Sequence, residues 1–153
     1  MSDPIHLLHV LHNNPFIFAS AFGNFYKLLG EKEYSLLLGY VILPITLHQP
    51  SRKFLNKANC TSSLRTMLKE RQNIYGLDER VVLYREMTNT TIQYLLGIGS
   101  ISIHSQVAVS VTDHQILDGT APEGVIKAAR RLGTFFHPYD VPTIFRMLGV
   151  MSL

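Results

Sequence analysis

The sequence predicts a helix-dominated α+β fold, organised as a single domain with one small β-hairpin. Apolar residues recur at helical spacing through most of the chain. Alternation with a period of two is confined to residues 101–111. The 153 residues contain no internal repeat, low-complexity tract or long linker, and they suffice for one hydrophobic core. We therefore expect one domain over residues 5–153, after a flexible N-terminus of residues 1–4.

The first helix is expected to begin at Asn14 and to end before Gly30. Asn14 is a favourable N-cap, and Pro15 suits the first helical position. Gly30 stands where a C-terminal glycine belongs. One apolar stripe, which should face the core, consists of Phe18, Phe22, Phe25 and Leu29.

A second helix is expected over residues 31–48. This segment is apolar on nearly all sides, so the helix should lie at the centre of the domain. Pro44 should kink the helix or end its regular part, because proline has no N–H to donate.

Three further helices should precede the hairpin. Residues 51–57 form a short basic helix, and Thr61 or Ser62 caps the next one, which runs to about residue 72. Asp78 opens a long helix to about Leu96, with an apolar side and a polar side.

A β-hairpin is expected after the break at residues 97–99, which contain two glycines. Its strands are Ile101–Ile103 and Val107–Val111, and its turn at residues 104–106 lacks the usual Gly or Asn. Two helices should close the chain, over residues 122–136 and 142–150.

The composition favours an obligate subunit of a larger assembly. The chain is 46% hydrophobic and 16% charged, against about 25% charged residues in an average soluble protein. So few charges leave apolar surface that a partner would cover. The net charge of +3 is compatible with nucleic-acid contact without being diagnostic of it.

The expected location is the cytoplasm. A single cysteine, Cys60, forms no intramolecular disulfide and fits a reducing compartment. We expect no signal peptide, because the N-terminus lacks a basic region and a small-residue cleavage site. The longest apolar stretch, residues 36–47, is too short to span a bilayer.

Three histidines near the N-terminus, His6, His9 and His12, resemble a metal site in their spacing. On a helix, successive members of this set lie about 60° apart and the outer two about 120° apart, so all three cannot easily meet one ion. The HExxH pattern is absent. We therefore expect no metal and no cofactor, with these histidines in an ordinary helix or interface.

Nucleophile and phosphate motifs are also missing, and we expect no enzymatic activity and no catalytic residue. GxSxG and GxxxxGK[ST] do not occur. Cys60 stands beside an expected helix start, which could lower its pKa, and a Cys–His pair stays open. The simpler interpretation is a small, half-buried residue before a helix cap.

Basic residues gather in two places and mark candidate contacts with a partner or DNA. With His48, these candidates are Arg52, Lys53, Lys57, Lys127, Arg130 and Arg131. The clusters could be solvated helix faces, or they could form a patch that binds phosphates or an acidic partner. A fold that brings them together would favour the second interpretation.

The element order from residue 61 to residue 111 is that of a winged helix, which often binds DNA through its second helix. Here the second helix carries Arg80 and Arg85 against three acidic residues, Asp78, Glu79 and Glu86. A helix that enters the major groove should be basic. We therefore expect a protein-docking element, and keep a small winged-helix DNA-binding regulator as the alternative function.

Several segments in order along the chain resemble one family, the middle component of bacterial three-component ABC systems. These segments are Asn14-Pro15, LPITLHQPSR (43–52), TSSL (61–64), RLGTFF (131–136) and PTIFRMLGV (142–150). Lamassu-type antiphage and antiplasmid complexes resemble this arrangement. The resemblance implies a non-catalytic adaptor that links an SMC/Rad50-like ABC ATPase to an effector, which is often a nuclease. It further implies that the adaptor does not contact a membrane and that DNA is engaged through the complex. It also places partner-binding apolar and basic surface around residues 47–55 and 131–136.

Overall fold

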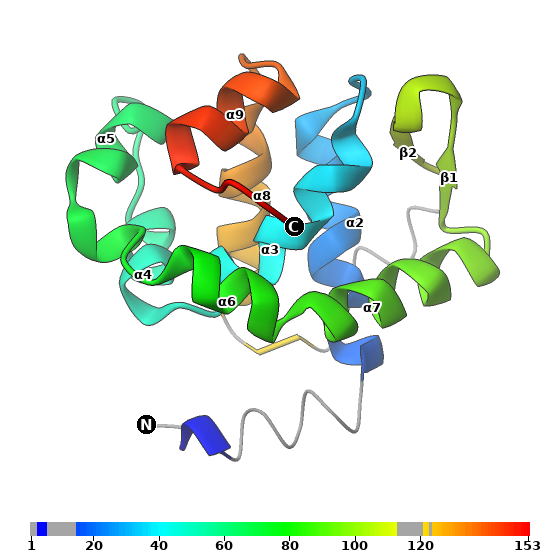
Figure 1. Cartoon of the computed structure of the whole chain (residues 1–153), viewed down its shortest axis with the longest axis horizontal. Helices are drawn as coiled ribbons and strands as arrows, with labels where there is room; N and C mark the ends of the chain where they lie inside the picture. The colour runs from blue at the N-terminus through cyan, green and yellow to red at the C-terminus, as the bar shows by residue number, and fades with distance from the viewer. Residues whose placement is uncertain (1–2, 6–14, 113–120, 123) are drawn as a thin grey trace.

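Two helices lie side by side at the centre of the computed structural model, which describes residues 3–5, 15–112, 121–122 and 124–153 (Figure 1). Helix α2 (Ala19–Leu29) follows a 3₁₀ turn, η1 (Pro15–Phe18), and helix α8 spans Val125–Phe136. The predicted stripe of the first helix is confirmed, since none of its four residues exposes any surface: Phe18, Phe22, Phe25 and Leu29. Helix α8 begins three residues later than predicted, after Gly124.

The crossing of α2 and α8 is closest at Gly133. A Cβ at this position would lie 2.5 Å from the main-chain oxygen of Phe25 and 3.2 Å from the main-chain nitrogen of Leu29. Only glycine therefore permits this approach of the two backbones. The RLGTFF segment is thus part of the core, with Leu132 and Phe136 fully buried.

The predicted helix over residues 31–48 is only half correct. An α-helix, α3, covers Gly39–Thr46, and a 3₁₀ turn, η2 (Ser35–Leu38), precedes it. Tyr34 adopts a left-handed conformation with φ of 65°, which an α-helix cannot contain. The central position of α3 is confirmed, because seven of its residues are buried, and Pro44 lies inside the helix two residues before its end.

The next two helices differ from the expected bounds. Helix α4 spans Gln49–Asn56, and α5 spans Leu64–Lys69. Helix α4 thus begins two residues earlier than expected, and α5 is shorter than expected. The cap of α5 is Ser63, not Thr61 or Ser62, because the Ser63 hydroxyl accepts the Thr66 N–H and the Thr66 hydroxyl accepts the Ser63 N–H. A 3₁₀ turn, η3 (Arg71–Asn73), replaces the last predicted turn.

The long helix predicted from Asp78 to Leu96 is two helices, α6 (Leu77–Leu83) and α7 (Arg85–Gly97). They are separated at Tyr84, whose φ and ψ are −95° and 5°. This break turns the chain while the apolar side stays on the core, with Val81, Ile92 and Leu95 buried.

The hairpin forms between β1 (Ile101–Ile103) and β2 (Val109–Val111), which pair antiparallel with Ile101 opposite Val111. Its second strand begins two residues later than predicted, because the 3₁₀ turn η4 (Ser105–Val107) occupies the intervening residues. Helix α9 (Val141–Leu148) closes the domain, capped by the Asp140 carboxylate.

The winged-helix arrangement is not shown. Helix α5 packs on α4 and α8, whereas the hairpin packs on α2 and α7. In Figure 1 the hairpin and α5 lie at opposite ends of the molecule. Within the described residues, no helix combines the length and apolar character that crossing a bilayer would require.

Candidate interaction surfaces

Nine of the fourteen Lys and Arg residues lie on three helices and one turn that pack together, namely α4 with the residue after it, α5, η3 and α8. We call this set the basic surface: Arg52, Lys53, Lys57, Arg65, Lys69, Arg71, Lys127, Arg130 and Arg131. Across residues 49–74 and 124–137, which the structure describes in full, the only acidic residue is Glu70. The charge of the chain is therefore strongly segregated.

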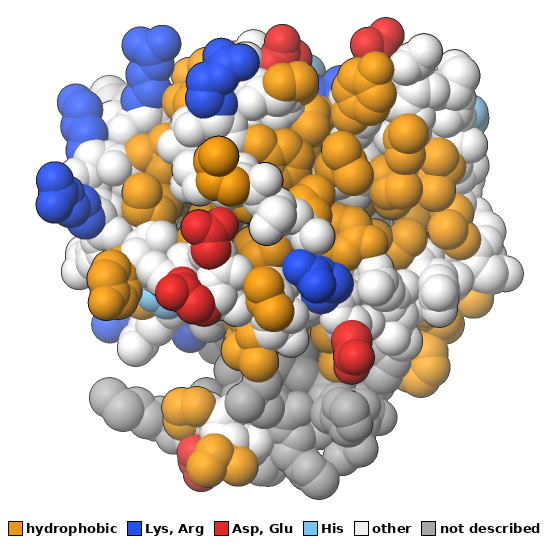
Figure 2. Space-filling view, viewed as in Figure 1, with side chains coloured by type: hydrophobic (Ala, Val, Ile, Leu, Met, Phe, Trp, Pro, Cys, Tyr) orange, Lys and Arg blue, Asp and Glu red, His pale blue; other side chains and the backbone are white. Residues whose placement is uncertain are grey.

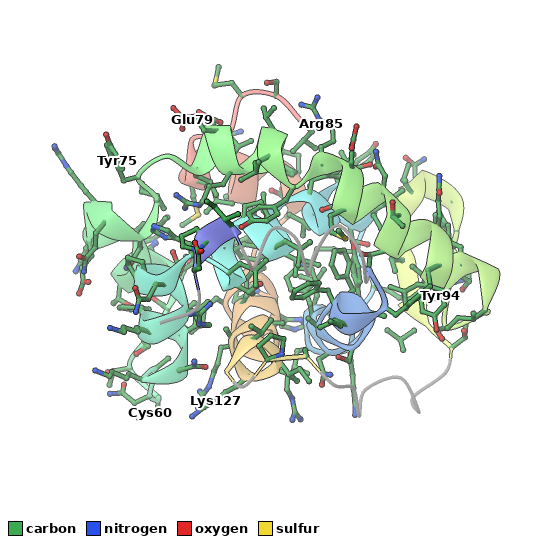
Figure 3. All side chains as sticks on the ribbon, turned by 90° about the horizontal axis from the view of Figure 1, so that it is seen from below. Cys60, Tyr75, Glu79, Arg85, Tyr94 and Lys127 are labelled. Atoms are coloured by element: carbon green, nitrogen blue, oxygen red, sulfur yellow. The ribbon has the colours of Figure 1, made fainter. Side chains whose placement is uncertain are left out.

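The fold brings the two predicted basic clusters onto neighbouring helices. Helix α4 packs on α8, where the rings of Phe54 and Phe135 lie 6.4 Å apart, and α5 packs on both helices. Figure 2 shows Lys and Arg side chains gathered over α5. In Figure 3, Lys127 lies on the opposite side of the molecule from Arg85 and Glu79.

Six of the seven predicted contact residues belong to this surface, and the seventh is His48; Arg52 is half-buried. Lys53, Lys57, Lys127 and Arg130 are exposed, and Arg131 is half-buried. Lys53 and Lys57 line a groove of about 460 Å³ that lies between α4 and the segment of α5 and η3.

His48 and Arg52 serve the fold as well. The Arg52 guanidinium donates to the main-chain oxygens of Thr46 and Leu47, at 3.5 and 3.3 Å. Arg80 reaches the same end of α3, where its Nε donates to the Pro44 oxygen at 2.9 Å. Two cations thus stabilise the negative end of the helix dipole of α3.

His48 lies between these arginines as the N-terminal cap residue of α4. Its Nδ1 is 2.9 Å from the Ser51 hydroxyl, which donates to the Asn73 oxygen at 2.6 Å. Burial, together with the positive charges of Arg80 and Arg52, lowers the pKa of His48 to about 4. The imidazole is therefore neutral at physiological pH and adds no charge to the basic surface.

A second surface is apolar and lies around the hairpin turn. We call it the apolar hairpin surface, defined by four exposed large side chains: Tyr34, Leu37, Ile103 and Val107. Hydrogen bonds join its two segments: the Tyr34 N–H donates to the Gln106 oxygen at 2.7 Å, and the Tyr34 hydroxyl donates to Gln106 Oε1 at 3.0 Å. Figure 2 shows hydrophobic side chains gathered on this side of the molecule.

Backbone strain is concentrated at the apolar hairpin surface. Among the described residues, three other than glycine have positive φ: Tyr34 at 65°, Gln106 at 61° and Val107 at 55°. All three lie in the two segments joined by the Tyr34–Gln106 hydrogen bonds. A β-branched residue in this region is a steric outlier, and such strain clusters at functional sites. This observation singles out the hairpin turn from the other exposed apolar residues.

Acidic side chains border this surface. Glu31 lies 3.6 Å from His104 of the turn, and Glu33 is exposed one residue before Tyr34. An apolar centre with an acidic margin favours a protein partner that presents apolar residues flanked by Lys or Arg.

Lys32, between the acidic residues that border the apolar hairpin surface, connects this segment to the end of α8. Its Nζ donates to the main-chain oxygens of Phe136 at 3.1 Å, His137 at 2.9 Å and Tyr139. Burial lowers the pKa of Lys32, and the charge of Asp140 opposes that shift. The lysine thus acts as a cap for α8, because it satisfies carbonyl groups that the helix leaves free.

Neither the apolar hairpin surface nor the contribution of α5 and η3 to the basic surface was among the expected sites. Arg65, Lys69 and Arg71 could have been found from the shortage of acidic residues between 49 and 72. Most apolar side chains of residues 47–55 and 131–136, where an apolar partner surface was expected, face the core instead, and the half-buried Phe54 lines the groove beside α4. Buried examples are Leu47, Leu55, Leu132 and Phe136.

The remaining candidate sites offer little chemistry. His6, His9 and His12 lie outside the described residues. In the part of the chain that the structure describes, no three His, Cys, Asp or Glu side chains could share a metal ion. Cys60 is exposed rather than half-buried, three residues before the cap of α5 (Figure 3).

A family model matches the chain from residue 3 to residue 152, and its description is ABC-three component (ABC-3C) system Middle Component 3. No curated protein and no solved structure matches the chain. The family match extends over all described elements, from η1 to α9.

Proposed function

Because the chain belongs to the family of ABC-three component system Middle Component 3 proteins, we propose that it is a non-catalytic adaptor that links the ABC ATPase of such a system to its effector. The observation that carries this proposal is the family match over residues 3–152. The same proposal includes an SMC/Rad50-like ATPase, an effector nuclease and a bacterial antiphage or antiplasmid role in the cytoplasm, with DNA engaged by the complex.

Two surfaces of different chemistry support an adaptor role. The basic surface and the apolar hairpin surface involve different elements, so two partners could be bound at once. We assign the apolar hairpin surface to a protein subunit of the complex, which would contribute an apolar segment with flanking Lys or Arg residues. The nucleotide state of the ATPase would then change how tightly the effector is held.

Co-expression with the neighbouring open reading frames, followed by a tagged pull-down and mass measurement, tests the proposal. We expect a stable complex that contains an SMC-like ATPase. A soluble monomer that ignores its neighbours would contradict the adaptor role.

One pair of variants tests the assigned surface. Val107→Glu should reduce the recovered partner at least tenfold, because it places a carboxylate in an apolar contact with an acidic margin. Val82→Glu on α6 is the control, since Val82 is also exposed but lies outside this surface. Equal recovery with both variants would exclude the hairpin turn as the docking site.

A further inference from the structure

The basic surface differs from the rest of the described molecule in lacking exposed large apolar side chains. In residues 47–74 and 124–150, all of which the structure describes, no Leu, Ile, Val, Met, Phe or Tyr side chain is exposed. The exception at its border is Tyr75, which is 82% exposed directly after these residues. Exposed residues of these types occur elsewhere, for example Leu37, Val82, Ile98 and Met151. Apolar and cationic surface are thus separated in the fold.

The cations of this surface are also not neutralised within the described part of the chain. The one ion pair among the described residues joins His104 and Glu31, which lie outside the basic surface. Glu70, the single carboxylate among these cations, accepts a hydrogen bond from Gln72 at 3.1 Å. The positive charge is therefore available to a partner.

These two properties distinguish between classes of partner. A protein interface needs an apolar centre with a few large anchoring side chains, and this surface has none. A single-stranded nucleic acid needs exposed aromatic rings on which bases stack. The exposed ring of Tyr75 follows η3, but in Figure 3 it lies on the side of Glu79, opposite Lys127, so it offers no stacking platform beside the cations of α8. A duplex backbone needs only dispersed Lys and Arg residues, because neutralised phosphates release counterions.

We propose that the basic surface binds the phosphate backbone of duplex DNA directly, without reading its sequence. Exposed side chains of α5 and α8 supply the contacts, with Lys53 and Lys57 beside them. This inference rests on the proposed adaptor function, since it makes DNA a second partner beside the protein subunit at the apolar hairpin surface. It also goes beyond that function, in which DNA is engaged through the complex.

A matched pair of double variants of the full chain tests this inference. Arg65→Gln with Arg130→Gln removes one cation from α5 and one from α8, both exposed. Arg85→Gln with Arg146→Gln removes the same charge and the same residue type from α7 and α9. Arg85 lies on the side of the molecule away from Lys127 in Figure 3.

Binding to a 30-base-pair duplex is measured by fluorescence anisotropy at several salt concentrations, together with the thermal midpoint of each variant. We expect the logarithm of the wild-type affinity to fall linearly with the logarithm of the salt concentration. The Arg65/Arg130 variant should lose about two from the slope and about 60-fold in affinity at 0.1 M salt. The Arg85/Arg146 variant should change the affinity less than threefold.

Equal losses in the two double variants would overturn the proposal, since they would reflect net charge alone. Absence of duplex binding, with binding to polyglutamate that depends on Arg65 and Arg130, would also overturn it and identify an acidic protein as the partner. The adaptor proposal is tested separately, because the Arg65/Arg130 variant should still co-purify with the ATPase. A complex that forms normally, with unchanged DNA affinity, refutes only the inference about DNA.

Discussion

Replacing Gly133 by alanine adds one methyl group at the crossing of α2 and α8. That Cβ would lie 2.5 Å from the Phe25 oxygen, about 0.8 Å closer than the shortest comfortable C···O contact. The nearest atoms belong to the main chain of α2, so no rotamer change relieves the clash. The helices must separate, and the buried side chains on both sides lose contact.

Overpacking of this kind costs about 2–3 kcal/mol, and the higher helix propensity of alanine returns about 1 kcal/mol. We therefore expect Gly133→Ala to lower the free energy of unfolding by about 1–2 kcal/mol. For a chain of this length the thermal midpoint should fall by about 2–8 °C. Differential scanning calorimetry and urea unfolding measure both quantities.

Gly97→Ala is the control, because a Cβ at Gly97 in the last turn of α7 meets no atom within 4 Å. It should leave stability unchanged or raise it by up to about 1 kcal/mol. Adding Leu28→Gly to Gly133→Ala, which removes the Leu28 Cβ that lies 3.2 Å from the new methyl group, should not restore stability. A Gly133→Ala protein as stable as Gly97→Ala, or one rescued by the change at Leu28, would refute the assignment of the clash to the α2 backbone.

Three further changes address the strained turn, the lysine cap and the buried histidine. Val107→Gly should raise the free energy of unfolding by about 0.5–2 kcal/mol, because glycine adopts the positive φ without strain. The same variant should weaken recovery of the protein partner. A lower free energy of unfolding, measured with urea, would show that Val107 is not strained. Lys32→Met should lower the free energy of unfolding by about 1–2 kcal/mol, because carbonyl oxygens at the end of α8 lose a charged hydrogen-bond donor. Lys27→Met is the control: Lys27 is exposed, and its replacement should leave the free energy of unfolding unchanged. The His48 pKa of about 4 lies below the ordinary 6.5, so the unfolded chain binds the proton more readily and stability should fall as the pH drops from about 6.5 to 4. After allowance for solvent screening, the loss of stability over this pH range is about 1 kcal/mol, and the His48→Asn variant should not show it. Parallel stability–pH profiles for the wild type and His48→Asn would argue against a lowered pKa of His48.

The sequence determined the features that depend on local chemistry. The stripe from Phe18 to Leu29, the central apolar segment around α3, the hairpin and the two C-terminal helices all follow from the spacing of apolar residues. Periodicity reports which side of an element faces the core, and the core here is built from those sides. The family resemblance also lies in the sequence itself, since glycine and proline positions mark its segments.

Helix ends and breaks depended on contacts between distant residues. The chain at Tyr34 turns left-handed beside Gln106, 72 residues away. The predicted 78–96 helix is divided at Tyr84, and the residues on both sides keep their apolar faces on the core. Local propensity favoured continuous helices in both places, and tertiary packing decided otherwise.

The arrangement of the candidate surfaces was decided by the tertiary structure alone. The sequence showed basic residues on two separate segments, and the packing of α4, α5 and α8 placed those segments next to each other. It also showed too few charges to cover the molecule, without saying which apolar residues would remain exposed. Whether a side chain is buried depends on residues that are distant in the chain. Leu132 is therefore buried in the core and Val107 is exposed, although the local sequence around each residue does not indicate this difference.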